Sequence, residues 1–167
     1  MVYNVIVTAY RREGRFLLKE LSKYGEFKTT SFRDVLVGEV EDVNKLLKVL
    51  CDEPPLSLAR AIPIKEVIEF TKPEELFKLL KKKVIKHAKL KPKETFRVTI
   101  ERRGWKGEIN SHEWAKKLGA LIYEKTKNPV SLTKPDVEIV IEVMQDTCGI
   151  TVIKKKDRDK YFFIRTK

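Results

Sequence analysis

The order of strand-like and helix-like patterns over the first 70 residues constrains the fold more than any other feature. Apolar runs bounded by turn residues predict strands, and apolar side chains at helical spacing predict helices. In order, these are a strand at 2–10, a helix at 11–25, strands at 26–32 and 34–40, a helix at 41–55 and a strand at 59–70. Pro54 and Pro55 stop the second helix. The order is therefore β-α-β-β-α-β.

This order is the split βαβ, or ferredoxin-like, arrangement. We expect it to form a first domain over residues 1–70, with the boundary between Phe70 and Lys72. The second domain, 71–167, begins with a lysine-rich helix that runs from a Thr71 cap to about Lys93. Strands are expected at 96–102, at 137–143 and from Cys148 onward. The fold class is α+β, with a ferredoxin-like domain followed by an α/β domain.

The balance of charge points to a polyanionic partner. Lys and Arg number 36 against 24 Asp and Glu, which gives a net charge of +12. Such a field favours nucleic acid first and an anionic membrane second. No apolar run approaches the roughly 20 residues of a membrane helix, and the start lacks a signal-peptide pattern. We therefore expect no membrane partner and a cytoplasmic location. The dominance of Lys and Glu over a single glutamine is typical of thermophile proteins.

The sequence offers no pattern for a cofactor, a metal or a catalytic centre. Cys51 and Cys148 lie far apart and outside metal-ligand spacing, so reduced thiols are expected, with a disulfide as the alternative. A G-x-G-x-x-G motif, a P-loop and a cysteine pair are all missing from the sequence. We expect no cofactor, no metal and no catalytic residues.

One segment, Thr95 to Gly119, joins a strand, a basic aromatic turn and a capped helix. Phe96, Val98 and Ile100 alternate with polar residues as in a strand with one covered face. The turn "RRGWKG" follows, and Asn110 then offers a cap to a helix that begins near Ser111. Guanidinium groups and a free helix start both favour phosphate. The predicted RNA-binding residues are Arg97, Arg102, Arg103, Trp105, Lys106, Asn110, Ser111, His112, Lys116, Lys154, Lys155 and Lys156.

Several aromatic and basic residues of this domain also have ordinary structural explanations. Trp105 either stacks on a base or packs against the neighbouring helix, and Trp114 is expected in the core. The lysine face of the helix from Lys72 to Lys93 is either solvated or in contact with phosphate. His87, on that helix, is expected to face solvent.

The same segment, with "VSLTKPDVEIVIEV" after it, resembles the THUMP domain, an RNA-binding module of transfer-RNA modification enzymes. The matching residues are Phe96, Val98, Arg102, Arg103, Gly104, Ser111, Gly119, Val130, Leu132, Pro135, Asp136 and Val137. The likeness spans most of residues 70–155, and the leading half is similar to the ferredoxin-like domain that usually precedes THUMP. Relatives often show a glycine cluster in the helix after the turn, where this chain has only Gly119.

The resemblance implies a grip on the acceptor stem and 3′ CCA end of transfer RNA. It also implies a partner catalytic domain, which a chain of this length does not contain. With "RAIPIKEVI" between the halves and "CGITV" near the end, the chain is similar to the standalone accessory subunits for transfer-RNA cytidine acetylation. The expected partners are therefore transfer RNA and a separate acetyltransferase or other modification enzyme.

Three alternatives remain open at this point. The chain could serve another transfer-RNA-modifying enzyme, such as a methyltransferase or a thiolation enzyme. It could itself be a small RNA-modifying or RNA-cleaving enzyme that uses His112, Glu113 and Asp136 as general acid and base. Finally, it could be a protein-interaction or ribosome-associated module whose charge only aids solubility or binding to ribosomal RNA.

Overall fold

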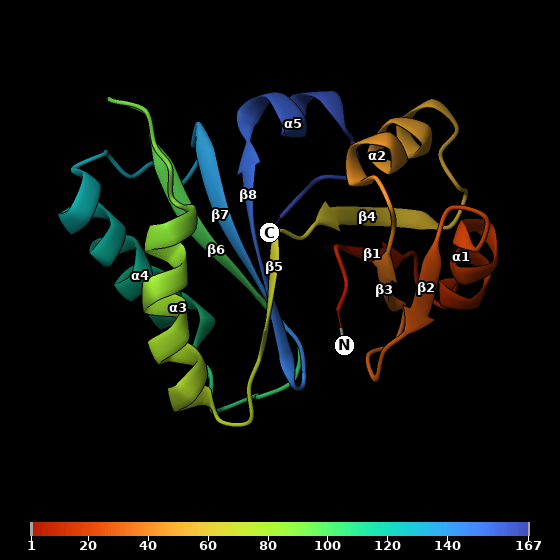
Figure 1. The fold of residues 1–167 in the computed structure, drawn as a ribbon, viewed down its shortest axis with the longest axis horizontal. Coiled ribbons are helices and arrows are strands. Elements are labelled where there is room, and N and C mark those ends of the chain that lie inside the picture. The colour runs from red at the N-terminus through yellow and green to blue at the C-terminus, as the bar shows by residue number, and fades with distance from the viewer. Residues whose placement is uncertain (1, 167) are drawn as a thin grey trace. The chain divides into compact units, whose positions relative to one another are not determined.

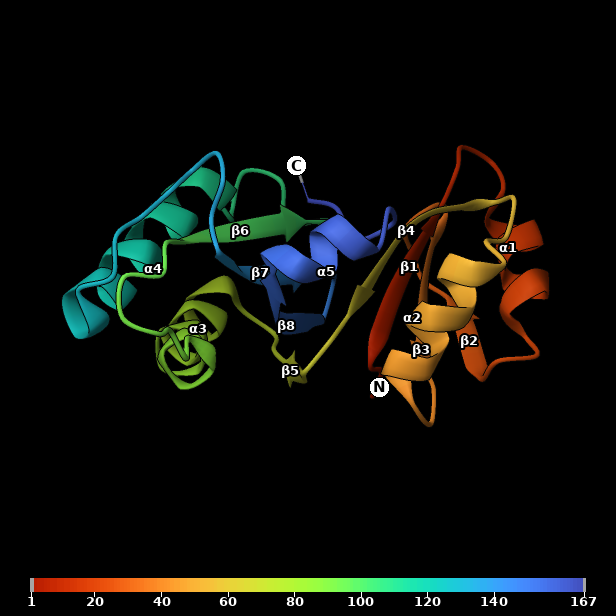
Figure 2. The same ribbon diagram turned by 90° about the horizontal axis from the view of Figure 1, so that it is seen from above.

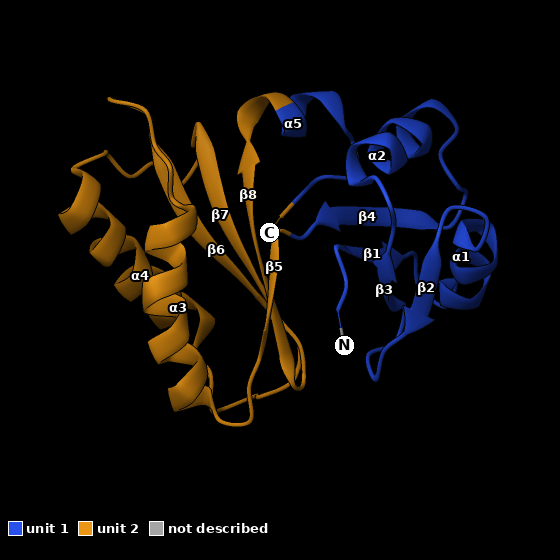
Figure 3. Cartoon of the chain, viewed as in Figure 1, with its two compact units in different colours: residues 1–64, 157–165 blue, residues 65–156, 166–167 orange. Residues whose placement is uncertain are grey.

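The computed structural model describes residues 2–166 and divides them into two compact units, each with its own four-stranded sheet (Figures 1 and 3). The first unit runs to Ile64 and includes Asp157–Arg165. The second contains Lys65–Lys156 and Thr166. The α+β fold class expected from the sequence is confirmed.

The first unit has the predicted β-α-β-β-α-β order. Its elements are β1 Val5–Ala9, α1 Gly14–Leu21, β2 Glu26–Thr29, β3 Val35–Glu39, α2 Val43–Asp52 and β4 Leu58–Pro63. The strands lie in the order β2-β3-β1-β4, with every neighbouring pair antiparallel. This is the split βαβ topology. The helices bury Leu17, Leu21, Leu46, Leu47 and Leu50.

The second unit carries both of its helices on one face of its sheet (Figure 2). Its elements are β5 Glu66–Glu69, α3 Pro73–His87, β6 Phe96–Arg102, α4 Ser111–Thr126, β7 Val137–Val143 and β8 Thr147–Lys154. The strand order is β5-β8-β7-β6, in which β6 and β7 are parallel and the other pairs antiparallel. A short helix, α5 Lys155–Lys160, follows β8.

The single strand predicted at 59–70 is wrong, because this stretch forms two strands in two different sheets. β4 pairs with β1, whereas β5 pairs with β8. The change occurs between adjacent residues: the Ile64 N–H donates to the Asn4 carbonyl at 2.8 Å, and the Lys65 N–H donates to the Ile150 carbonyl at 3.0 Å. The boundary between the units therefore falls at Ile64 rather than after Phe70.

The C-terminal stretch also departs from the predicted domain of 71–167, because Asp157–Arg165 belongs to the first unit. Its Phe163 is fully buried, and the Phe163 carbonyl accepts a 3.0 Å hydrogen bond from Ala61 of β4. Tyr161 stacks on Phe163 with ring centroids 5.4 Å apart. The first unit is thus built from two separate stretches of the chain.

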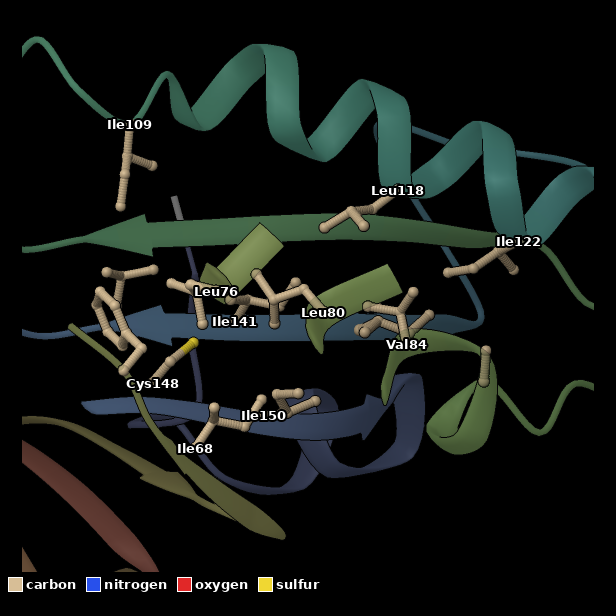
Figure 4. Close-up of a cluster of buried hydrophobic side chains, with 14 of the residues drawn as sticks. Ile68, Leu76, Leu80, Val84, Ile109, Leu118, Ile122, Ile141, Cys148 and Ile150 are labelled. Atoms are coloured by element: carbon tan, nitrogen blue, oxygen red, sulfur yellow. The ribbon is translucent and has the colours of Figure 1, made fainter. Parts of the chain in front are cut away.

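The core of the second unit lies between the helices and the sheet (Figure 4). It confirms the predicted strand pattern, since Phe96 is fully buried and Val98 and Ile100 pack beside it. The core residues of the helices are Leu76, Leu80, Val84, Leu118 and Ile122, and Ala88, the residue after α3, joins them. Trp114, predicted to be in the core, is half-buried and meets Phe77 edge-on with ring centroids 4.9 Å apart.

The ends of α3 differ from the prediction. Lys72, not Thr71, occupies the N-cap position, and the Thr71 hydroxyl instead lies 3.5 Å from the Glu75 carboxylate. Pro73 takes the first helical position, as expected. The helix ends at His87 rather than near Lys93. Pro92 lies shortly beyond this end, and proline disfavours helical backbone in the residue before it.

Candidate nucleic-acid interface

The basic turn lies between β6 and α4 and has a tightly folded backbone. Gly104, Trp105 and Gly107 all have left-handed backbone angles, with φ of 77°, 54° and 83°. The Trp105 carbonyl accepts hydrogen bonds from the N–H groups of Glu108 and Ile109, each at 3.0 Å. Glycine takes such angles freely, whereas a tryptophan there costs about 1 kcal/mol. Other contacts must therefore hold Trp105 in place.

The Trp105 side chain supplies those contacts. Its indole N–H donates to the Gln145 carbonyl at 2.8 Å, and its ring lies 5.7 Å from the ring of Phe70. The side chain is half-buried and joins the edge of the core. Packing, one of the two explanations offered for Trp105, is what the structure shows, although the partners are Phe70 and the β7–β8 turn rather than a helix. Base stacking by this ring remains a prediction.

Arg97 is held by a buried carboxylate on the sheet face opposite the helices. Its Nε donates to Glu138 Oε2 at 2.7 Å and its Nη1 donates to the Leu132 carbonyl at 2.6 Å. Thr99 and Thr166 donate to the same Glu138 oxygen. Only 18% of the Arg97 side chain is exposed, and Glu138 is fully buried. Arg97 therefore has a structural role, and its predicted contact with RNA is untested.

Arg103 repeats this arrangement at the other end of β7. Its Nη1 lies 2.8 Å from Glu142 Oε2, with 16% of the arginine side chain exposed and the glutamate fully buried. Arg102, the last residue of β6, donates from Nη1 to the Gly104 carbonyl and is half-buried. Two of the three arginines on which the phosphate hypothesis rested are thus paired with glutamates that the alternating strand pattern did not identify as buried.

The exposed polar side chains of this region lie at the turn and along the first part of α4. Lys106, Asn110, His112 and Lys116 are exposed, and Ser111 is half-buried. The predicted cap is confirmed, since Asn110 Oδ1 accepts the Glu113 N–H at 3.0 Å. Glu113 also pairs with Lys117 at 2.8 Å, and the hydrogen bond from Lys117 lowers the pKa of Glu113. The helix start and its lysines form an accessible positive site.

The structure does not bring the Lys154–Lys156 run to this turn. Lys154 pairs with Val137 at the start of β7, whereas Arg102 pairs with Val143 at its end. Six steps along a strand separate these positions, or about 20 Å. All three lysines are exposed. They are therefore a second basic patch rather than part of the turn.

The three residues considered as a general acid and base, His112, Glu113 and Asp136, are also kept apart by the strand. Asp136 precedes β7 and accepts the Thr95 N–H at 2.9 Å, beside the start of β6. His112 and Glu113 follow the turn beyond the end of β6. A seven-residue strand lies between the two positions, so these side chains do not meet. Among residues 2–166 there is also no group of three or more metal-ligating side chains.

A cluster that sequence reasoning missed links β5 to α3. Glu66 contacts Lys83, Lys86 at 3.3 Å and His87 at 2.8 Å. The hydrogen bond from Lys83, followed by that from His87, lowers the pKa of Glu66 to about 2. The prediction that His87 faces solvent is wrong, since only 14% of its side chain is exposed. The helical spacing of the three basic residues signalled a shared face, but nothing local in the sequence identified their partner.

Comparison with known proteins agrees with this architecture. A family model for the THUMP domain matches residues 70–153, half of the chain. The chain belongs to the THUMP-domain family. Membership implies RNA binding in the context of transfer-RNA modification. The matched region corresponds to the second unit, here called the THUMP unit, and includes the basic turn and α4.

Solved structures share the fold of both units. The chain is 22% identical to PH1313 from Pyrococcus horikoshii OT3, with a TM-score of 0.66 over 92% of this chain and 54% of that one. It is 17% identical to TrmN from Thermus thermophilus, with a TM-score of 0.68 over 89% and 44%. A 4-thiouridine synthetase in complex with RNA and ATP is 17% identical to the chain, with a TM-score of 0.54. That match covers 91% of this chain and 41% of the synthetase. The chain thus spans about half the length of these proteins or less.

Three further findings concern curated relatives, membrane-spanning helices and the cysteines. A search among curated protein sequences found no match. Within residues 2–166, no helix has the length and apolar character needed to cross a bilayer. Both cysteines are free, as expected, and burial raises the pKa of the Cys148 thiol.

Proposed function

We propose that this chain binds transfer RNA through its THUMP unit and presents it to a separate modification enzyme, without catalysing a reaction itself. The acceptor stem and the 3′ CCA end are the proposed contacts. The observation that carries the proposal is the family match over the unit that holds the exposed basic turn. The partner enzyme we favour is a cytidine acetyltransferase, as the resemblance to its standalone accessory subunits suggests.

The geometry of the turn supports contact with a nucleic-acid backbone. Lys106, before the α4 start, and Lys116, in the second turn of α4, are exposed, and the N–H groups and dipole of the helix start favour an anion. The anchored Trp105 and the capped helix hold the backbone of the turn and of the helix start in place, which limits the entropy lost on binding. Phosphate contacts fix position and carry little base information, so we expect strong shape preference and weak sequence preference.

A second candidate function is to bind transfer RNA for a different modification enzyme. Several proteins that share this fold have methyltransferase, methylase or thiouridine synthetase in their descriptions. Those chains are about twice as long as this one or more, so each includes a part that is not matched here. The RNA-binding role is the same in both cases, and only the partner enzyme differs.

The first experiment compares the affinity for intact transfer RNA with that for the same RNA without its 3′ CCA, at fixed near-physiological salt. A loss of tenfold, about 1.4 kcal/mol, supports recognition of the single-stranded end. Lys106→Ala with Lys116→Ala should weaken binding more than Lys125→Ala with Lys127→Ala. The second pair removes the same charge from the far end of α4 and serves as the control. Equal binding of the two RNAs would contradict the proposed grip on CCA.

The adaptor role is tested separately. Transfer RNA is incubated with the pure chain, with a cytidine acetyltransferase, or with both, and the nucleosides are analysed by mass spectrometry. The proposal predicts no modified nucleoside from the chain alone and a higher acetylcytidine yield from the pair than from the acetyltransferase alone. A new nucleoside or RNA fragments with the chain alone would favour the enzyme alternative.

A further inference from the structure

The first unit contains a hollow that the sequence analysis did not identify. It lies between the start of α1 and the turn that joins β2 to β3, with a volume of about 590 Å³. The residues that line it include Arg12, Arg15 and Arg33, all three exposed. α1 and β2 lie side by side in this unit (Figure 1). Three arginines from two separate segments thus line one hollow.

Asp34 fixes the two segments to each other. Its Oδ2 accepts the Arg12 N–H at 2.9 Å, and its Oδ1 accepts the Gly14 N–H at 3.0 Å. Its carbonyl also accepts the Ala9 N–H at 2.8 Å. Arg12 and Asp34 both have left-handed backbone angles, with φ of 67° and 62°. Such angles in non-glycine residues cost about 1 kcal/mol or more each and concentrate at functional sites.

The β2–β3 turn is held just as firmly. The Thr30 hydroxyl donates to the Val35 carbonyl at 2.9 Å and accepts the Phe32 N–H at 3.1 Å. The turn therefore keeps its shape and presents Arg33 at a set position. A rigid rim of this kind lowers the cost of ordering side chains around a ligand.

The arginines of the hollow differ from those of the THUMP unit in their partners. Arg97 and Arg103 are bound to buried glutamates. By contrast, the part of the chain that the structure describes shows no ion pair for the side chain of Arg12, Arg15 or Arg33. The one carboxylate in the lining is that of Asp34, whose oxygens already accept two backbone N–H groups. The hollow therefore carries uncompensated positive charge.

We propose that this hollow binds phosphodiester groups of the RNA backbone. The planar fork of a guanidinium group matches the geometry of phosphate oxygens and forms paired, charge-assisted hydrogen bonds. Phe32 is the aromatic residue among those that line the hollow. The inference rests on the proposed function, since the RNA in question is the transfer RNA that the THUMP unit binds. It adds a second contact surface, located on the ferredoxin-like unit.

The test compares two triple variants of the full chain in titrations with transfer RNA. The first is Arg12→Ala, Arg15→Ala and Arg33→Ala. The control is Lys23→Ala, Lys45→Ala and Lys48→Ala, which removes the same charge from exposed positions of the same unit outside the hollow. Both triples weaken the long-range field equally, so a difference between them reports direct contact. Circular dichroism melts confirm that both variants fold.

We expect the hollow triple to lose about tenfold or more in affinity and the control triple to lose less than threefold. The slope of log Kd against log salt should fall by about 2 to 3 for the hollow triple, because three phosphate contacts are lost. Equal losses in the two triples would overturn the proposal while leaving transfer-RNA binding by the THUMP unit intact. Failure of the unmodified chain to bind transfer RNA would instead overturn the proposed function.

A free nucleotide or inorganic phosphate offers the same chemistry as an RNA phosphodiester, and a second titration distinguishes these sources. AMP and inorganic phosphate are added to the unmodified chain, and the backbone amide signals of the hollow are followed by NMR. The proposal predicts no saturable binding of either at micromolar concentrations. Micromolar binding of AMP at the hollow, together with unchanged RNA affinity of the hollow triple, would assign the site to a free nucleotide.

Discussion

Replacing Arg97 with methionine separates a structural arginine from an RNA-binding one. The substitution keeps most of the side chain's length but removes the hydrogen bonds to Glu138 Oε2, to the Leu132 carbonyl and to Thr166. Loss of one partner of a buried ion pair costs about 3 to 5 kcal/mol. Thr99 and Thr166 still donate to the Glu138 carboxylate. We therefore expect the lower end, about 3 kcal/mol, or about 6 to 12 °C in Tm.

The assay uses the placement of the two tryptophans. Trp105 and Trp114 both lie in the THUMP unit, so tryptophan fluorescence during urea unfolding reports on that unit. Arg97→Lys keeps the charge without the fork and should lose about half as much stability. Arg11→Met, an exposed arginine in the other unit, should change stability by less than about 0.5 kcal/mol.

Transfer-RNA affinity is measured on the same variants at a temperature where all are folded. We expect Arg97→Met to stay within about threefold of the unmodified chain, because its guanidinium group is occupied by Glu138. Unchanged unfolding with a large loss of RNA affinity would refute this reasoning. In that case the arginine would leave the glutamate when RNA binds.

Three further predictions concern stability. Glu66→Gln should lower the free energy of unfolding by about 1 to 2 kcal/mol at pH 7. Hydrogen bonds, of which that from Lys83 has the largest effect, lower the pKa of Glu66 from 4.5 to about 2. The stability that the Glu66 carboxylate contributes is therefore complete above pH 4.5 and is lost as the pH falls to about 2. Acid titrations of the variant should show a flatter profile over that window. Trp105→Phe removes the indole hydrogen bond and should cost about 1 kcal/mol in urea unfolding followed by circular dichroism. Gly107→Ala should cost about 1 kcal/mol because φ is 83°. Gly119→Ala, in mid-helix, would place its Cβ 4.0 Å from Val98 Cγ2, an ordinary contact, and should instead stabilise by about 0.5 to 1 kcal/mol. Equal effects of the two glycine substitutions would contradict the backbone argument.

Local patterns predicted the elements of this chain well. The apolar alternation of Phe96, Val98 and Ile100 and the Asn110 cap are properties of neighbouring residues, and both are found in the structure. The prediction of one strand over 59–70 failed because strand propensity does not say which sheet a strand joins. Only the partners of Ile64 and Lys65, both distant in the sequence, show that the chain changes sheets there.

The site was harder to predict for the same reason. Clustered arginines suggested phosphate contact, but Arg103 and Arg97 pair with glutamates 39 and 41 positions away. The spacing of Glu138 and Glu142 on one face of β7 was visible, whereas their full burial depends on what covers that face. Arg12 and Arg33 likewise come together only through Asp34. Charge in a sequence identifies the class of partner, while long-range pairing decides which charges remain available.

The division of the first unit between two stretches of chain affects how the protein folds during synthesis. Phe163, whose carbonyl accepts the Ala61 N–H and whose ring is fully buried, is made about a hundred residues after β4. Domains generally fold in order as they leave the ribosome. Here the residues that begin the first unit wait, partly unburied, while Lys65–Lys156, the main stretch of the THUMP unit, is translated. This stretch is therefore free to form most of the THUMP unit first, before Asp157–Arg165 completes the first unit and Thr166 adds its hydrogen bond to Glu138.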